Sequence, residues 1–305
     1  MAFALAGCGG SGQGGAAAGP QTIRVGVIPI VDVAPVYLGM QRGFFEESGL
    51  NLELSSGQGG AAIIPGVVGG SLDIGFGNNT SLVLAASKGL PLQVIASGVY
   101  STGERGEDYV ELLVGDDSPI RSAADLAGKT VAVNTLQNLG DTSVRDSVRD
   151  AGGDPEAVRF VEMPFPNMNA ALAGGEVDAI WQVEPFLALA KAQGHRVIAS
   201  PLVDTKPDLM VSTFFTTEQY AGQNADVVNR FKSAIDRSLT YAQQHPDEVR
   251  RIIPSYLDVP PEVAAEMVLP TWDPRIDRET FDVLVDLGTR DGLLEEKPRL
   301  DELLG

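Results

Sequence analysis

One short pattern occurs twice, as Gly69-Gly-Ser-Leu-Asp73-Ile-Gly-Phe76 and as Gly174-Gly-Glu-Val-Asp178-Ala-Ile-Trp181, 105 positions apart. In each copy a glycine pair ends a helix-like segment, and an aspartate then leads into apolar residues that are typical of a strand. Both copies lie in the same succession of strand-like and helix-like segments. The repeat therefore predicts two lobes that are built alike.

The segments around both copies alternate between short apolar runs and helix-like stretches. Around the first copy we predict strands at 23–28, 50–54, 72–76 and 92–97, and helices at 35–47, 61–68 and 80–88. Around the second we predict strands at 109–114, 130–133, 159–163, 178–181 and 196–199, and helices at 123–126, 141–151, 167–173 and 185–193. This alternation is typical of an α/β fold whose mixed or mostly parallel sheets are covered by helices.

The remaining third of the chain is almost purely helical. A returning strand at 212–215 precedes helices at 225–244, 246–256, 261–269 and 278–291. We expect these helices to form a layer on the first lobe. The predicted organisation is a tail at 1–20, lobe 1 from 21–100 plus 212–305, and lobe 2 at 101–211. The two crossovers between the lobes are expected near 98–108 and 200–211.

The composition excludes several kinds of partner. The 305 residues carry 41 acidic and 22 basic side chains, a net charge of −19, and such a surface repels nucleic acid and anionic membranes. The single cysteine, Cys8, cannot form an intramolecular disulfide, and His195 and His245 lack the spacing of a zinc site. We expect no nucleic acid partner, no metal and no cofactor.

The N-terminal segment resembles a bacterial lipobox. It reads Leu5-Ala-Gly-Cys8, and small residues before the cysteine are what a signal-peptide cleavage site requires. The Gly-, Ser- and Ala-rich residues up to 20 predict a flexible tether. We therefore expect lipidation at Cys8 and attachment to a membrane by that lipid. The alternative is an unstructured tail with an incidental thiol.

Six segments between residues 22 and 216 carry a family resemblance: Ala34-Pro-Val-Tyr-Leu-Gly39, Gly43-Phe-Phe-Glu-Glu-Ser-Gly-Leu50, Gly70-Ser-Leu-Asp-Ile-Gly-Phe76, Asp125-Leu-Ala-Gly-Lys-Thr-Val-Ala-Val133, Ala170-Ala-Leu-Ala-Gly-Gly-Glu-Val-Asp-Ala179 and Glu184-Pro-Phe186. In this order they resemble the type II periplasmic solute-binding proteins of nitrate, taurine and sulfonate ABC importers, a family that includes binders of thiamine precursors. The resemblance implies a two-lobed monomer that binds a small molecule, partners an ABC-importer permease and catalyses no reaction. It also implies an extracytoplasmic location, as a cell-surface lipoprotein or in the periplasm.

In open α/β sheets a ligand lies beyond the carboxyl ends of the strands, and between two lobes it lies in the cleft. The polar and aromatic side chains in the corresponding loops are the predicted ligand contacts: Asp32, Gln58, Asn78, Asn79, Thr80, Tyr100, Thr135, Asp141, Thr142, Trp181 and Glu184. Free N–H groups near Thr80 and Thr142 suit an anionic head group, and Trp181 suits a flat ligand. The alternative for residues 78–81 and Asp141 is helix capping alone.

Charge leaves the ligand class open. Asp32, Asp141 and Glu184 all fall in loops on the cleft side, where Arg105 is the one basic candidate. We predict a small organic molecule such as a sulfonate or carboxylate. Because carboxylates disfavour an anion, a neutral or zwitterionic heterocycle such as a thiamine pyrimidine precursor is the alternative.

Two other classes of protein are less favoured. An enzyme on the same fold would need a nucleophile or phosphate-binding motif after a strand, and none is recognised. A ligand-sensing domain of a regulator would need an attached DNA-binding or signalling module.

Overall fold

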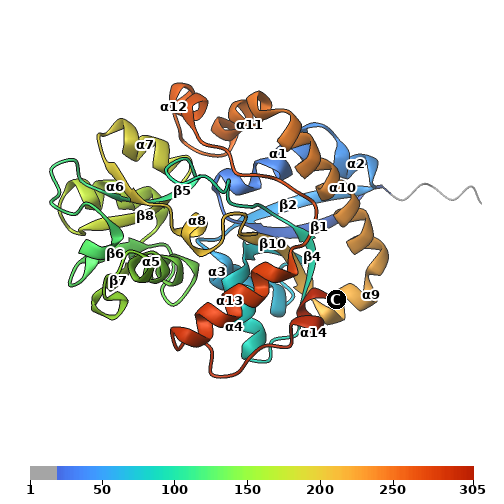
Figure 1. The fold of residues 1–305 in the computed structure, drawn as a ribbon. Helices are drawn as coiled ribbons and strands as arrows, with labels where there is room; N and C mark the ends of the chain where they lie inside the picture. The colour runs from blue at the N-terminus through green and yellow to red at the C-terminus, as the bar shows by residue number, and fades with distance from the viewer. Residues whose placement is uncertain (1–18) are drawn as a thin grey trace, which may run out of the picture.

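The computed structural model describes residues 19–305, which form two five-stranded sheets flanked by helices (Figure 1). The predicted lipidation site, Cys8, and most of the predicted tether lie outside the described residues. We refer to the first sheet and its helices as lobe 1, and to the second sheet and its helices as lobe 2.

The sheet of lobe 1 has the strand order β2-β1-β3-β10-β4. Its strands are β1 Gln21–Val27, β2 Leu50–Ser56, β3 Ile74–Asn78, β4 Leu92–Ser97 and β10 Ser212–Thr217. β1 pairs in parallel with β2 and β3, whereas β10 is antiparallel to β3 and β4. The sheet is therefore mixed, with one reversed strand that comes from a distant part of the sequence.

The sheet of lobe 2 repeats this plan with the order β7-β6-β8-β5-β9. Its strands are β5 Val110–Val114, β6 Thr130–Val133, β7 Arg159–Glu162, β8 Ala179–Val183 and β9 Arg196–Ala199. Here β5 is the reversed strand, antiparallel to β8 and β9. The predicted α/β class is confirmed, and of the two predicted forms, mixed or mostly parallel, both sheets are mixed.

The repeated aspartates have the same structural role in both lobes. A carboxylate oxygen of Asp73 accepts a hydrogen bond from the backbone N–H of Arg24 at 2.8 Å, and Asp178 accepts one from the N–H of Thr130 at 2.8 Å. The N–H of each aspartate in turn donates to the carbonyl of the same partner. Each aspartate thus aligns the start of one strand with its parallel neighbour, which explains why the pattern occurs once per lobe.

Helices cover both sheets, and four short 3-10 turns connect them. The helices of lobe 1 that precede β5 are α1 Ala34–Gln41, α2 Phe44–Glu47, α3 Gly60–Val68 and α4 Asn79–Ser87. The helices of lobe 2 are α5 Leu139–Asp150, α6 Phe165–Ala173 and α7 Phe186–Ala192. A further helix, α8 Pro201–Thr205, lies in the predicted crossover segment between β9 and β10. The 3-10 turns are Val31–Val33, Ala123–Leu126, Pro155–Ala157 and Ile253–Ser255. The single helix predicted at 35–47 is wrong, because Gly43 adopts a left-handed φ of 75° and separates α1 from α2.

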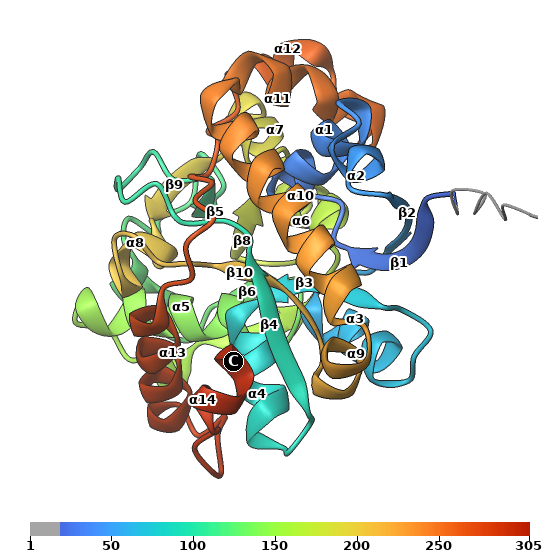
Figure 2. The same cartoon turned by 90° about the vertical axis from the view of Figure 1, so that its right-hand side faces the viewer.

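The C-terminal third forms the expected helical layer. Its helices are α9 Glu218–Gln223, α10 Ala225–Gln244, α11 Pro246–Ile252, α12 Pro261–Glu266, α13 Arg278–Arg290 and α14 Leu300–Leu304. α10 packs on α1, α13 on α4 and α14 on β4, all in lobe 1 (Figure 2). α12 instead contacts α7 of lobe 2, so the C-terminal segment touches both lobes.

Two chain segments cross between the sheets side by side. Tyr100, after β4, forms an antiparallel bridge with Met210, just before β10, and the N–H of Ser101 donates to the carbonyl of Leu209. A third segment joins them, because Tyr100 also bridges to Thr271. These crossings lie within the predicted crossover segments. The exact division of residues between the lobes stays a prediction.

Candidate functional site

A cavity lies between the two sheets. Its apolar lining consists of Ile28, Ile30, Phe76, Val110, Leu139, Phe165, Val183 and Val211, and its polar or amphipathic lining of Asp32, Asn78, Tyr109, Asn134, Trp181 and Ser212. The cavity measures about 30 Å³, enough for roughly two water molecules and far below the about 300 Å³ of a typical ligand pocket. The structure therefore represents a closed form of the cleft.

Several polar atoms in the lining have no partner. The Oδ1 of Asp32, the hydroxyl of Tyr109, the Nε1 of Trp181 and the Oγ of Ser212 are buried and make no hydrogen bond. A buried polar group without a partner costs about 1–3 kcal/mol, so such groups are rare in native proteins and indicate a bound water or ligand. Four of them around one cavity mark it as the candidate binding site.

The electrostatics of the cavity are set by Asp32. Burial, with a smaller contribution from the nearby Asp108, raises the pKa of Asp32 to about 7. None of the described residues that line the cavity is a lysine or arginine. The cavity therefore offers one carboxyl group and several neutral hydrogen-bonding groups to a ligand.

Three of the predicted contact residues line this cavity. Asp32 lies in the 3-10 turn after β1, Asn78 ends β3, and Trp181 lies in β8 with its ring centroid 5.9 Å from that of Phe165. The Oδ1 of Asn78 accepts from the N–H of Ser81 at 2.9 Å, so its oxygen caps α4. As ligand contacts these three residues remain predictions, and they are the ones that the geometry favours.

Asn79 and Tyr100 do not line the cavity, because their polar groups are engaged elsewhere. The Nδ2 of Asn79 donates to the carbonyl of Met210 at 2.6 Å, and its Oδ1 accepts from Thr213 at 2.9 Å. The hydroxyl of Tyr100 donates to the carbonyl of Arg275 at 2.6 Å. Both side chains thus tie lobe 1 to the crossing segments.

Asp141, Thr142 and Glu184 also lie outside the cavity lining. Asp141 accepts from the backbone N–H groups of residues 137 and 138, which is the capping alternative, and Thr142 donates to the carbonyl of Asn138 at 2.7 Å. Glu184 accepts from the N–H groups of Ala188 at 2.9 Å and Val268 at 3.1 Å. Burial raises the pKa of Glu184 to about 7. Glu184 therefore braces β8 against the C-terminal segment.

The last three predicted residues lie near the cavity without lining it. Gln58 is exposed, and its carbonyl accepts from the Nδ2 of Asn134 at 3.1 Å. Thr135 is partly exposed and faces Gly59 of the other lobe, where an added Cβ would lie 2.8 Å from its Oγ1. Thr80 is buried in α4 with an unpartnered hydroxyl.

The prediction missed Tyr109 and Ser212, although both line the cavity. Each lies at the amino end of a reversed strand, β5 or β10. Because these strands run antiparallel to their neighbours, their amino ends share the sheet edge with the carboxyl ends of the parallel strands. Asn134 and Phe165 were also missed. Asn134 directly follows β6, and Phe165 is the first residue of α6, shortly after β7, so both lie beyond the carboxyl end of a strand, where ligand contacts were expected.

Direct contacts between the lobes hold the cleft closed. The Nδ2 of Asn138, before α5, donates to the hydroxyl of Ser81 in α4 at 2.9 Å. The N–H of Val31 donates to the carbonyl of Glu184 at 3.2 Å. With the bond from Asn134 to Gln58, these contacts join the two lobes directly.

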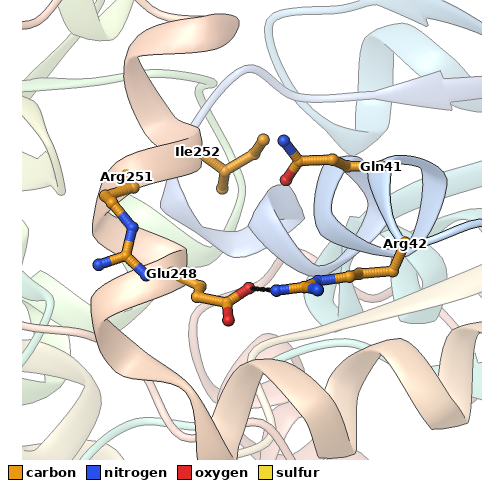
Figure 3. Close-up of a pocket in the computed structure, with 5 residues that line it drawn as sticks. All are labelled: Gln41, Arg42, Glu248, Arg251 and Ile252. Carbon is orange, nitrogen blue, oxygen red and sulfur yellow. Dashed lines mark hydrogen bonds and ion pairs between the residues drawn. The ribbon is translucent and has the colours of Figure 1, made fainter.

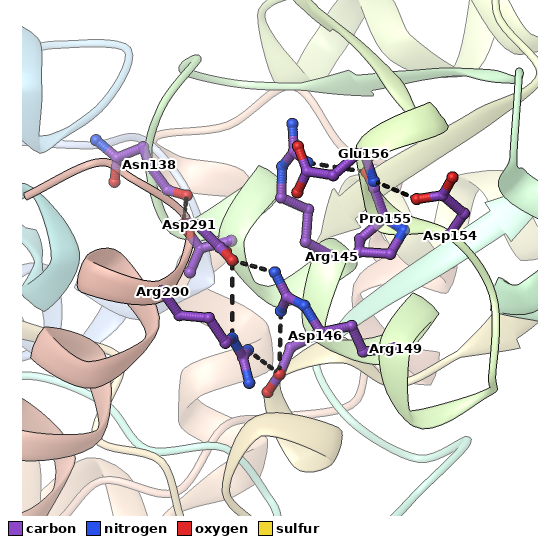
Figure 4. Close-up of polar contacts among 10 residues, drawn as sticks. Asn138, Arg145, Asp146, Arg149, Asp154, Pro155, Glu156, Arg290 and Asp291 are labelled. Carbon is purple, nitrogen blue, oxygen red and sulfur yellow. Dashed lines mark hydrogen bonds and ion pairs between the residues drawn. The ribbon is translucent and has the colours of Figure 1, made fainter.

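A second interlobe contact lies at the far end of α5 (Figure 4). Arg149 pairs with Asp291 at the end of α13, and Arg290 pairs with Asp146. Arg149 also lies 3.5 Å from Asp146, and the Nε of Arg290 lies 3.8 Å from Asp291. We call these four residues the interlobe charge cluster. α5 thus contacts lobe 1 at both of its ends.

A larger hollow of about 450 Å³ lies on the surface between α1 and α11 (Figure 3). It is lined by Gln41, Arg42, Glu248, Arg251 and Ile252, and Arg42 and Glu248 pair across it. In the part of the chain that the structure describes, no lining residue of this hollow contributes a buried polar atom without a partner. We therefore assign the candidate site to the cleft.

Within residues 19–305, no three His, Cys, Asp or Glu side chains are grouped so that they could hold a metal ion. No helix in this range has the length and apolar composition that crossing a membrane requires.

Comparison with known proteins agrees with this architecture. The formylaminopyrimidine-binding protein of Halalkalibacterium halodurans is 24% identical over 221 residues, covering 72% of this chain and 64% of that protein. The alkanesulfonate-binding protein SsuA of Xanthomonas axonopodis pv. citri, solved with bound MOPS, superimposes with a TM-score of 0.79 at 18% identity, covering 94% of this chain and 99% of that one. The desulfurization enzyme DSZB superimposes with a TM-score of 0.69 at 19% identity, covering 93% and 96%.

The likeness to the solved structures establishes the fold, which is the two-lobed periplasmic-binding-protein fold that the sequence predicts. The chain spans less than two thirds of the length of the curated relatives that it matches first. The model of the family described as NMT1/THI5 like matches residues 30–249, most of the chain. The protein therefore belongs to the NMT1/THI5-like family.

Proposed function

We propose that this protein is the solute-binding component of an ABC importer, and that it captures a small organic molecule in the cleft between its lobes. The observation that carries the proposal is the closed interlobe cavity with its four unpartnered polar atoms. The formylaminopyrimidine-binding relative and the alkanesulfonate-binding neighbour support it by their names. The proposed location is outside the cytoplasmic membrane, as a periplasmic protein or anchored by lipid on Cys8, and the proposed state is a monomer.

The proposed mechanism is capture by closure. A ligand that contacts both sheets favours the closed form, and the chain bends at the crossover segments 98–108 and 200–211. The ligand drives closure only by its additional affinity for the closed state. A membrane permease then receives the closed, loaded form.

The lining of the cavity distinguishes between the ligand classes. A sulfonate or carboxylate is the first prediction from the sequence, and a neutral or zwitterionic heterocycle is the alternative. An anion would meet the carboxyl group of Asp32 without a lysine or arginine among the described lining residues. The rings of Phe76, Tyr109, Phe165 and Trp181 instead suit a flat or apolar solute. The geometry therefore favours the heterocycle over the sulfonate.

We infer that the protein catalyses no reaction. DSZB shows that a similar fold occurs in a protein named as an enzyme, so the fold by itself does not decide this point. Asp32 and Tyr109 are the titratable residues among the described lining, and neither His195 nor His245 is part of it. Support for the inference therefore comes from the cavity and from the relatives that are named as binding proteins.

A thermal-shift panel on the purified protein tests the proposed function. It contains taurine, alkyl and aromatic sulfonates, aromatic carboxylates, nitrate, pyrimidines and flavins. A ligand at a hundredfold excess over its Kd adds about 2.7 kcal/mol to the free energy of unfolding, which raises Tm by several degrees. Trp181→Ala should reduce the shift, whereas Tyr220→Ala, in α9 and outside the cavity lining, should retain it. A flat panel, together with no small molecule released on denaturation in mass spectrometry, would contradict the proposal.

A further inference from the structure

The carboxyl group of Asp32 is placed to meet the solute. It is 4% exposed, it lines the cavity, and its Oδ1 has no hydrogen-bond partner. The neighbouring Asp108 differs, because it accepts from the hydroxyl of Ser101 and from the N–H groups of Thr102 and Tyr109. Asp32 is therefore the acidic side chain with hydrogen-bonding capacity left for a ligand.

The groups that surround Asp32 provide no compensating positive charge. Asp108 and Tyr109 approach it from the start of β5, and Tyr256 approaches it from the turn after α11. The indole Nε1 of Trp272, from the C-terminal segment, donates to the backbone carbonyl of Asp32 at 3.4 Å. All of these groups are acidic or neutral. A buried carboxylate without a cationic partner is costly, so ionised Asp32 needs a cation from outside the protein.

The remaining lining suits the rest of such a cation. Tyr109 and Trp181 line the cavity with Phe76 and Phe165, and the face of an aromatic ring attracts a positive charge. The unpartnered hydroxyls of Tyr109 and Ser212 can accept N–H groups that do not reach Asp32. One carboxylate and several rings around one cavity are complementary to an apolar ring that bears a cationic nitrogen group.

We propose that the solute is an organic cation, a small cyclic amine or amidine whose N–H groups bind Asp32 and whose ring lies among the aromatic side chains of the cleft. This inference rests on the proposed function and changes the favoured heterocycle from a neutral or zwitterionic one to a positively charged one. It places sulfonates and carboxylates among the solutes that the cleft rejects.

The inference predicts that protons compete with the solute. Burial raises the pKa of Asp32 to about 7 in the ligand-free form, and a bound cation favours the ionised carboxylate. Binding below pH 7 must therefore release a proton from Asp32, and the affinity must rise as the pH increases from 6 to 8. A solute without positive charge would produce neither effect.

Isosteric probes test the sign of the charge directly. The first set is benzamidine, benzamide and benzoate, and the second is cyclohexylamine, cyclohexanol and cyclohexanecarboxylate. We expect a cation to bind about tenfold or more tightly than its neutral counterpart at pH 8, and the anions not to bind, in isothermal titration calorimetry. Titration in phosphate and in MES, which both buffer at pH 6 and whose ionisation enthalpies differ, measures the proton that is released at this pH.

Two variants separate the role of Asp32 from general effects. Asp32→Asn should reduce the preference for the cation to about threefold or less, and it should abolish proton release. Asp236→Asn, on α10 and paired with Lys232, is the matched control and should behave as the wild type. Because Asp32→Asn removes a buried acid that lacks a partner, we expect it to fold with a Tm at least equal to that of the wild type.

Failure of this inference differs from failure of the proposed function. The inference is wrong if a neutral or anionic probe binds as tightly as its cationic counterpart. It is also wrong if neither benzamidine nor cyclohexylamine binds at 10 times the concentration at which a ligand found in the thermal-shift panel saturates the protein. The proposed function is then still tested separately, by the thermal-shift panel and by the release of a native ligand on denaturation. Proton release that persists in Asp32→Asn would likewise overturn the assignment of the cation to Asp32.

Discussion

The interlobe charge cluster should stabilise the closed form, and Arg149→Met tests this. Methionine keeps much of the apolar length of arginine but removes the charge. Arg149 pairs with Asp291, whose side chain is 2% exposed, and it lies 3.5 Å from Asp146. The variant leaves Asp291 buried in the closed form, with Arg290 at 3.8 Å and the nearby Arg145 as its remaining cations. When the cleft opens, α5 and α13 separate and Asp291 gains water, so the loss acts on the closed form.

The expected size of the effect follows from the exposure of the pair. Removing one partner of a fully buried ion pair costs about 3–5 kcal/mol, whereas a surface pair contributes about 0–1 kcal/mol. The Arg149 side chain is 23% exposed, so the pair lies between these cases. We expect a loss of about 2 kcal/mol, which lowers the ratio of closed to open molecules about thirtyfold.

Small-angle X-ray scattering of the ligand-free protein measures this change. A compact chain of this length has a radius of gyration of about 19 Å, and a larger open fraction increases it. Arg278→Met, on α13, is the control, because Arg278 pairs with the exposed Asp301 within lobe 1. If Arg149→Met lowers Tm but leaves the scattering of the folded protein unchanged, the cluster stabilises the fold and not the closure. Identical scattering and Tm for the wild type and both variants would also refute the reasoning.

Two further predictions concern stability. Asn79→Ala should lower the free energy of unfolding, measured by urea denaturation, by about 1–3 kcal/mol. The reason is that it removes the hydrogen-bond partner of the Met210 carbonyl and of the Thr213 hydroxyl. An unchanged free energy would show that water replaces both bonds. Burial raises the pKa of Asp32 and Glu184 to about 7 and that of Glu111 to about 8. Since these acids bind more protons in the folded than in the unfolded protein, the Tm of the ligand-free form should fall as the pH rises from 6 to 9, and the fall should be smaller in Glu111→Gln. A Tm that rises over this range would contradict the assignment.

The elements of this fold were predictable because their signals are local. The glycine pair and aspartate of each repeat marked the same junction in both lobes, and the strands at 92–97, 130–133 and 196–199 match β4, β6 and β9. A strand or helix of this kind is specified by the spacing of its own apolar residues. The helical layer was predicted for the same reason, since α10 buries Phe231, Ile235 and Leu239 along one face.

The site was only partly predictable, because proximity across a sheet is not a local property. Asp32, Asn78 and Trp181 were found from their positions near strand ends in the cleft. Asn79 and Thr142 occupy equivalent places in the sequence, yet the side chain of Asn79 bonds to Met210 and Thr213, and that of Thr142 bonds to the carbonyl of the residue that caps α5. Which residues in the first turn of a helix point into the cleft depends on how that helix packs against the rest of the protein. A short stretch of sequence does not contain this information.

The sequence by itself determined the strands, most helices, the twofold repeat and the helical C-terminal layer. Only the tertiary structure decided that β5 and β10 run in reverse, which brings Tyr109 and Ser212 to the same edge as Asp32. Only the tertiary structure decided that the Oδ1 of Asp32 is buried without a partner, while Asp141 and Glu184 accept hydrogen bonds from backbone N–H groups. The physical reason is that the environment of a charge depends on residues far apart in the chain, whereas periodicity depends on neighbours.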